Sequence, residues 1–276
     1  MNKKKIIEKF RNSLLIRTLK LIKLNKKLFF LTLAFDFLFI TSLYFLGQLI
    51  SALITANIPG IANFLMLPIL TLLFAVSFSI VYILLLILVY SFFKYNILDL
   101  IKSMNQKTEF DFKRFKKFYI LNLITYISGF LIFLTASLIF MGIKPEYISI
   151  TSLIIFIPLG LLFYSFLNFS HSYFASDALP VKAVLKRSLK KISKISSYYK
   201  VYLITLAYFL VYFIIYYPIA LLLKTILIQK YSLLGFFPIY SKIFSVITAI
   251  VMFGIIAHNR VYFYMTVKEE DNLTKQ

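Results

Sequence analysis

The stretch LFFLTLAFDFLFITSLYFLGQLISALI, residues Leu28–Ile54, decides the fold class. It carries one charged residue, Asp36, and exceeds the ~18 apolar residues that cross a bilayer core of about 30 Å. The apolar region of a cleavable signal peptide spans only about 7–15 residues. Barrel strands alternate in polarity with period two, and this stretch does not. We therefore interpret it as an uncleaved transmembrane helix.

Five further stretches meet the same length criterion. With the first, they lie near residues 28–54, 64–93, 118–141, 149–175, 201–223 and 244–266. The chain is 61% hydrophobic, with a mean hydropathy of +0.87, whereas soluble domains are about 45–50% apolar. The sequence predicts an all-α, polytopic helical membrane protein, with residues 1–276 forming a single membrane domain of six transmembrane helices.

The charge of the chain is strongly positive, with 31 Lys and Arg against 10 Asp and Glu, a net +21. In a soluble protein this balance would suggest a nucleic-acid partner. Here most basic residues precede the first span, follow the sixth, or join spans 2 to 3 and 4 to 5, whereas only Lys144, Lys224, Lys230 and Lys242 fall on the opposite side. The positive-inside rule therefore predicts that both termini lie in the cytoplasm and explains the charge without a nucleic-acid partner. We expect a protein of a prokaryotic inner membrane.

Three basic segments combine cations with apolar residues at helical spacing: residues 1–27, 94–117 and 182–194. We expect amphipathic helices on the cytoplasmic leaflet, where each Lys or Arg contributes about 1 kcal/mol of attraction to anionic lipid. The expected partners are therefore anionic lipids, with a protein partner or a second copy of the chain also possible. The predicted lipid-facing cations of the second and third segments are Lys113, Arg114, Lys116, Lys117, Lys182, Lys186, Arg187, Lys190, Lys191 and Lys194.

Asp36 is the one acidic residue placed inside a predicted span. An ionised group at this depth costs a few kcal/mol unless it has a partner. At a rise of about 1.5 Å per residue, Arg260 of the sixth span lies at a matching depth. We expect Asp36 to pair with Arg260, or with His258, as a structural clamp. The alternative is a functional role, in which Asp36 is a proton or cation site.

Other polar residues fall at similar predicted depths: Asn122 in the third span, and Asn168 and His171 in the fourth. Asn168 and His171 are three residues apart and therefore share a helical face. With Asp36, His258 and Arg260 they could line a polar cavity open to the inner leaflet. The alternative is that each forms a hydrogen bond with a neighbouring helix, a contact that contributes about 0.6 kcal/mol on average.

Motifs for catalysis are missing from the sequence. It contains no G-x-x-x-x-G-K-[ST] loop, no H-E-x-x-H pair and no G-x-S-x-G elbow. It has no Cys and only two His, which leaves little for a metal site. We therefore expect no catalytic residue, no metal and no cofactor.

The segment FASDALPVKAVLKRSLKKISK, Phe174–Lys194, resembles a pattern in poorly characterised prokaryotic six-helix membrane families. These include the membrane domain that accompanies some glycerophosphodiester phosphodiesterases. The positions that match are Ala183, Leu185, Arg187 and Ser188, and the likeness covers about residues 170–215. The resemblance implies a helical membrane domain and carries over no catalytic residue.

Two functions remain open from the sequence. The first is a non-enzymatic membrane component that engages anionic lipid or a protein partner through its basic cytoplasmic face. The alternative is a small transporter or transporter subunit whose polar site lies near the inner leaflet and includes Asp36.

Overall fold

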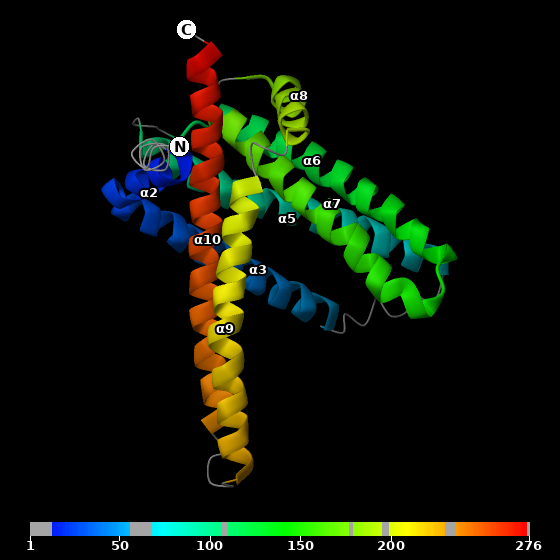
Figure 1. Ribbon diagram of the computed structural model, residues 1–276. Coiled ribbons are helices and arrows are strands. Elements are labelled where there is room, and N and C mark those ends of the chain that lie inside the picture. Colours follow the sequence, from blue (N-terminus) through cyan, green and yellow to red (C-terminus); the bar gives the residue numbers. More distant parts are fainter. Residues whose placement is uncertain are drawn as a thin grey trace. The chain divides into compact units, whose positions relative to one another are not determined.

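The computed structural model describes residues 13–55, 68–105, 110–176, 179–194, 199–229 and 236–274. Within these ranges the chain is helical and contains no strand (Figure 1). Six helices are long and apolar enough to cross a membrane, with spans at Lys26–Ala52, Val76–Ser103, Phe112–Leu138, Glu146–Ser176, Thr205–Leu222 and Lys242–Glu270. The predicted all-α class and the six spans are confirmed, and the chain is a multi-pass membrane protein.

The helices group into two compact units. The first unit, residues 26–188, holds α3 (Lys26–Thr55), α5 (Pro68–Ser103), α6 (Phe112–Leu138), the short 3₁₀ helix η1 (Ile139–Gly142), α7 (Pro145–Ser176) and most of α8 (Val181–Ile192). The second unit, residues 1–25 and 189–276, holds α2 (Leu14–Leu24), α9 (Tyr199–Gln229) and α10 (Phe236–Thr274). Each unit therefore has its own set of packed helices.

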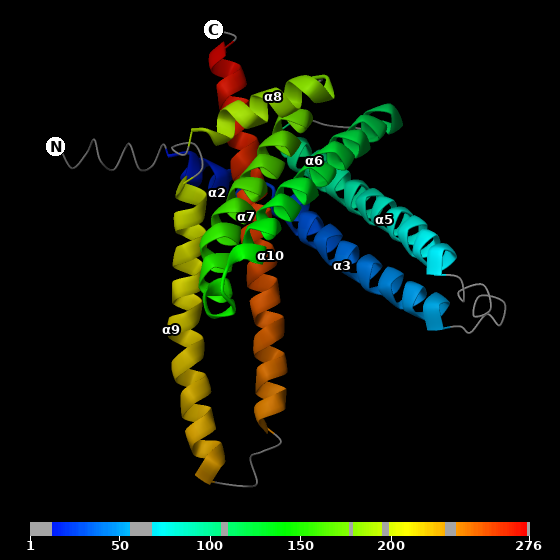
Figure 2. The ribbon, with the colours of Figure 1, turned by 90° about the vertical axis from the view of Figure 1, so that its right-hand side faces the viewer.

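Neighbouring helices of the first unit run antiparallel. Their register is visible in aromatic pairs with ring centroids 5.1–6.3 Å apart, namely Phe35–Phe93, Phe39–Tyr90, Tyr90–Tyr126, Tyr95–Phe118, Phe118–Phe174 and Tyr126–Phe163. Figure 2 shows α3 and α5 side by side. Because directions alternate, the start of α3, the end of α5, the start of α6 and the end of α7 meet at one end of the unit, which we call the basic end.

The packed core of the first unit lies toward the basic end. Its buried apolar side chains are Ile87, Tyr95, Ile97, Leu98, Ile101, Met104, Phe115, Phe118, Leu121, Phe169, Tyr173, Phe174, Ala175 and Val184. The far halves of α5, α6 and α7 expose most of their Leu, Ile and Phe side chains. Such side chains suit lipid, because lipid tails are as apolar as they are.

The sequence assigns residues 94–103 to a surface linker, and the structure shows that this assignment is wrong. They continue α5 without a break as far as Ser103. Ile97 and Ile101 are 1% and 0% exposed, so their apolar face packs inside the protein and not in the headgroup layer. The hydroxyl of Tyr95 donates to the carbonyl of Asp111, 3.3 Å away, just before α6 begins.

The second unit is built on the antiparallel pair α9 and α10 (Figure 2). The ring of Tyr216 lies 4.3 Å from that of Phe244, and the Thr248 hydroxyl donates to the Tyr212 hydroxyl at 3.2 Å. The short helix α2 packs on α10, where Arg17 forms an ion pair with Glu269. Of the predicted amphipathic helix at residues 1–27, the stretch Leu14–Leu24 is helical and residues 1–12 lie outside the described part, so its place at the lipid surface stays a prediction.

Gly129 marks a close approach of α6 to α7. A Cβ atom at this position would lie 2.5 Å from Cε2 and Cζ of Phe163, whose ring also packs against Tyr126 and Phe133. At Gly160 of α7, a Cβ would meet nothing within 4 Å. The two glycines therefore allow a matched comparison, because an added Cβ would overlap the Phe163 ring at Gly129 and would meet no neighbouring atom at Gly160.

We predict opposite effects of the same substitution at these two sites. Gly160→Ala should stabilise by up to about 1 kcal/mol, because alanine loses less backbone entropy in a helix. Gly129→Ala should destabilise by about 1–3 kcal/mol, because the Phe163 ring must move in a packed site. Thermal unfolding in detergent measures both changes. A shift of equal size and sign in the two variants would contradict the close approach.

Candidate functional site

A chain of buried polar side chains joins three helices of the first unit. His171 of α7 donates from Nε2 to Oδ1 of Asn122 on α6 at 2.7 Å. Asn122 Nδ2 donates to Oγ of Ser91 on α5 at 2.9 Å, and Ser91 Oγ donates to the Ile87 carbonyl at 2.6 Å. We call Ser91, Asn122 and His171 the polar cluster. Their exposed fractions are 0%, 0% and 2%.

The surroundings of the polar cluster hold its side chains in place. The His171 ring lies between the rings of Phe118 and Tyr90, with centroids 5.1 and 6.2 Å away. The Asn122 oxygen only accepts hydrogen bonds, so the observed contact requires a proton on His171 Nε2. Ser91 Oγ donates to a carbonyl of its own helix and accepts from Asn122, and neither contact pairs the hydroxyl with a general base. What the cluster does is tie α5, α6 and α7 together.

We predict that Asn122→Leu destabilises the protein by about 1–3 kcal/mol, because it removes both interhelical bonds and leaves the His171 donor without this acceptor. The matched control is Asn168→Leu, since the Asn168 amide donates to the Tyr164 carbonyl of its own helix. Thermal unfolding in detergent compares the two. Equal losses of stability in the two variants would show that the interhelical hydrogen bonds of Asn122 do not stabilise the protein.

The six residues of the predicted polar site fall in both units. Asn122 and His171 are in direct contact, and Asn168 lies one turn before His171 on α7. Asp36 lies in α3 of the first unit and is 4% exposed. His258 and Arg260 belong to α10 in the second unit. The pairing of Asp36 with Arg260 therefore stays a prediction.

Lys94 is a further candidate partner for Asp36, and it belongs to the same unit. Lys94 of α5 is 6% exposed. The ring contacts Phe39–Tyr90 and Phe35–Phe93 place it in the same layer of the α3–α5 interface as Asp36. The partner of Asp36 can therefore be identified by comparing Arg260 with Lys94.

We predict that Asp36→Asn and Arg260→Gln are each destabilising and that the double variant loses less than their sum, with a coupling of about 0.5–3 kcal/mol. Removal of one partner would leave the other as an uncompensated buried charge. The comparison is the cycle of Asp36→Asn with Lys94→Gln, for which the Arg260 pairing predicts the smaller coupling of the two. Coupling to Lys94 alone would refute the Arg260 pair. The measurement is thermal unfolding in detergent.

Most of the predicted lipid-facing cations are exposed. On α8, Lys182, Lys186, Arg187 and Lys190 face outward, whereas Val184 and Ser188 are fully buried. Lys194, just after α8, is also exposed, as are Lys113, Lys116 and Lys117 in the first turns of α6. Lys26 and Lys27 at the start of α3 add to the same end of the first unit. Among the described residues, the opposite end of this unit carries only Lys144 and Glu146 as charges.

Among the ten predicted lipid-facing cations, Arg114 and Lys191 make defined contacts within the protein. The Arg114 guanidinium donates to the carbonyls of Phe174 and Ala175 at 2.9 and 2.8 Å, and it lies 5.5 Å from the Phe174 ring centroid. It therefore caps the end of α7, where carbonyls lack helical partners. Lys191 donates to Glu270 of α10 at 2.7 Å, and its side chain is only 13% exposed. Both cations serve packing within the protein.

Sequence reasoning missed Ser91 and assigned Lys94 to a linker. The available signal was their spacing, because Ser91, Lys94 and Tyr95 fall on one helical face at the end of an apolar run. All three are buried in the structure. A serine at the end of a span is common, so this spacing alone does not single out the polar cluster.

Comparison with known proteins found no match among family models, curated proteins or solved structures. The resemblance of the α8 region to six-helix membrane families therefore stays a prediction. Of its four positions, Ser188 is buried and donates to the Val184 carbonyl, whereas Arg187 is exposed.

Proposed function

We propose that the chain is a non-enzymatic component of a prokaryotic inner membrane, with both termini in the cytoplasm, that engages anionic lipid through its basic end. The supporting observation is the segregation of charge in the first unit. Exposed cations of α3, of α6 and of the part of α8 up to Ser188 gather where the core is packed, and among the described residues the opposite end has one Lys and one Glu. Positive residues beside spans mark the cytoplasmic side, and that leaflet carries anionic lipid.

The helix α8 is the clearest element of this surface. It buries Val184 and Ser188, whereas its cations Lys182, Lys186 and Lys190 are exposed to the surroundings of the helix. Each basic residue near an anionic surface contributes about 1 kcal/mol, about a fivefold change in affinity. Several of them on one short helix would give a strong preference for phosphatidylglycerol over phosphatidylcholine.

We predict that phosphatidylglycerol raises the melting temperature of the detergent-solubilised protein more than phosphatidylcholine does, because only bound lipid stabilises the folded state. Replacing Lys182, Lys186, Arg187 and Lys190 with Gln should weaken the apparent affinity for phosphatidylglycerol by at least tenfold, on the order expected from about 1 kcal/mol per charge. Raised salt should weaken it too.

The matched control removes the same number of charges from the opposite side, with Lys144, Lys224, Lys230 and Lys242 replaced by Gln. It should leave the preference for phosphatidylglycerol within about twofold, a difference of less than about 0.5 kcal/mol. If the α8 variant keeps its preference, or if both lipids stabilise equally, the proposal is wrong. If the basic end shows no preference for anionic lipid, its cations would instead suit an acidic protein partner.

A second candidate function, a small transporter or transporter subunit, is favoured by the charges inside the spans. Asp36 and Lys94 are 4% and 6% exposed within membrane-spanning helices. Ionisable residues at such depths commonly mark ion or substrate pathways. The double-mutant cycle on Asp36 and Arg260 distinguishes the transporter from the lipid-binding component, because an acid that serves transport can be neutralised without loss of stability.

A further inference from the structure

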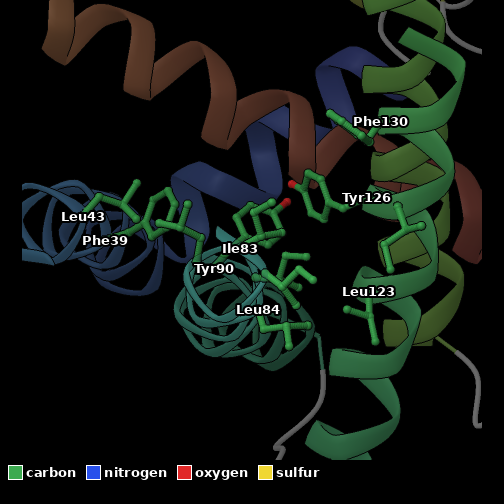
Figure 3. A pocket seen from close by; sticks show the side chains of 12 residues that line it. Phe39, Leu43, Ile83, Leu84, Tyr90, Leu123, Tyr126 and Phe130 are labelled. Atoms are coloured by element: carbon green, nitrogen blue, oxygen red, sulfur yellow. The ribbon is translucent and has the colours of Figure 1, made fainter. Parts of the chain in front are cut away.

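A cavity of about 550 Å³ lies between α3, α5 and α6 in the first unit. Figure 3 shows side chains from the three helices around it, among them Phe39, Ile83, Tyr90, Leu123, Tyr126 and Phe130. Its size is within the range of about 300–1,000 Å³ that small-molecule sites occupy. Every lining residue belongs to a membrane-spanning helix.

The lining residues nearer the basic end are more enclosed than those farther from it. The Tyr90 ring lies 5.8 Å from Phe39 and 5.1 Å from Tyr126, and Ile87 is 6% exposed. Farther from the basic end, Ile80 and Phe130 are 54% and 64% exposed. The exposed lining residues lie within membrane-spanning helices, at a depth where the surrounding solvent is lipid.

The walls exclude a polar occupant. They are aliphatic and aromatic, and the two tyrosine hydroxyls are the polar side-chain groups among the lining residues. A polar or charged solute would lose its hydration there without gaining enough hydrogen bonds. A hydrocarbon chain loses no hydration on moving in from the bilayer and gains dispersion contacts with the walls. The occupant that fits is an acyl chain.

The distance from the basic end fits a phospholipid that carries this chain. Along α6, Leu123 lies six residues beyond Lys117 and Phe130 lies thirteen beyond it, or roughly 9 and 20 Å at the helical rise. One leaflet of the hydrocarbon core is about 15 Å deep. A lipid whose headgroup lies beside Lys113, Lys116 and Lys117 can therefore place a chain in the cavity.

We propose that the cavity between α3, α5 and α6 is an acyl-chain site for an anionic phospholipid whose headgroup is held by the cations at the start of α6. This proposal rests on the proposed function and adds to it a defined site. The cations select the headgroup, and the apolar walls hold the chain. Lipids of the surrounding bilayer would exchange freely, whereas this one would be retained.

The absence of Trp from the chain makes a direct test possible. Phe130→Trp places a single fluorophore on the cavity wall at an exposed position that tolerates a larger ring, and Leu84→Trp provides a second reporter on α5. The control is Ile132→Trp, which lies on α6 about 3 Å away in depth but does not line the cavity. Each protein is reconstituted in phosphatidylcholine vesicles that contain a small fraction of brominated phosphatidylglycerol or brominated phosphatidylcholine.

The expected result is selective quenching inside the cavity. Brominated phosphatidylglycerol should quench the two cavity reporters at a roughly fivefold lower mole fraction than brominated phosphatidylcholine does, the ratio given by about 1 kcal/mol from one cation. The Ile132→Trp control should respond equally to both lipids. Replacing Lys113, Lys116 and Lys117 with Gln should abolish the difference at the cavity.

Equal quenching of cavity and control reporters by both lipids would overturn the site. The proposed function would survive that result if phosphatidylglycerol still stabilised the solubilised protein through α8. If that stabilisation were absent as well, both proposals would fail together. Quenching of the cavity reporters by both lipids alike, but at lower mole fractions than the control, would show an acyl-chain site without headgroup selection and would also refute the proposal.

Discussion

An apolar side chain gains little by leaving lipid for the interior of a membrane protein, because both are hydrocarbon. Helices in a bilayer must therefore be held together by close packing and by polar contacts. The first unit shows where these contacts are. The Ser91–Asn122–His171 chain ties three helices, and Arg114 caps the end of α7. The core forms around these contacts, and the far halves of the helices remain facing lipid.

The transmembrane architecture could be predicted from the sequence because the thickness of the bilayer sets a minimum apolar length. Six runs meet this length in the sequence, and six helices meet it within the part of the chain that the structure describes. The end of the second span was misplaced for a physical reason. Residues 94–103 contain no helix-breaking residue and place Ile97 and Ile101 on one face, a pattern that fits a surface helix and a buried one equally well. Only the packing against α6 decides between them.

The polar site was predictable in part. The sequence placed Asn122 and His171 at similar depths, because helices of known direction place residues at calculable levels, but it did not identify the contact between them. Ser91 carries no comparable signal, since serine usually bonds to its own helix, as Ser91 also does here. Counting cations along the chain likewise predicted a basic end but not the role of each residue. Arg114 and Lys191 have the same charge as their neighbours, and only their partners show that they serve packing.

Because the packed core of the first unit lies at one end, the two halves of its helices differ in how well they tolerate substitutions. Lipid-exposed positions of the far helix halves require only a hydrocarbon side chain, so exchange among Leu, Ile, Val and Phe there would cost little. Gly129, Asn122 and His171 have no such freedom, because each has a defined neighbour. Diverging copies would soon lose overall identity while keeping these few positions. Ancestry in such a protein would be recorded in a few packed residues of the spans and not in their lipid-facing positions.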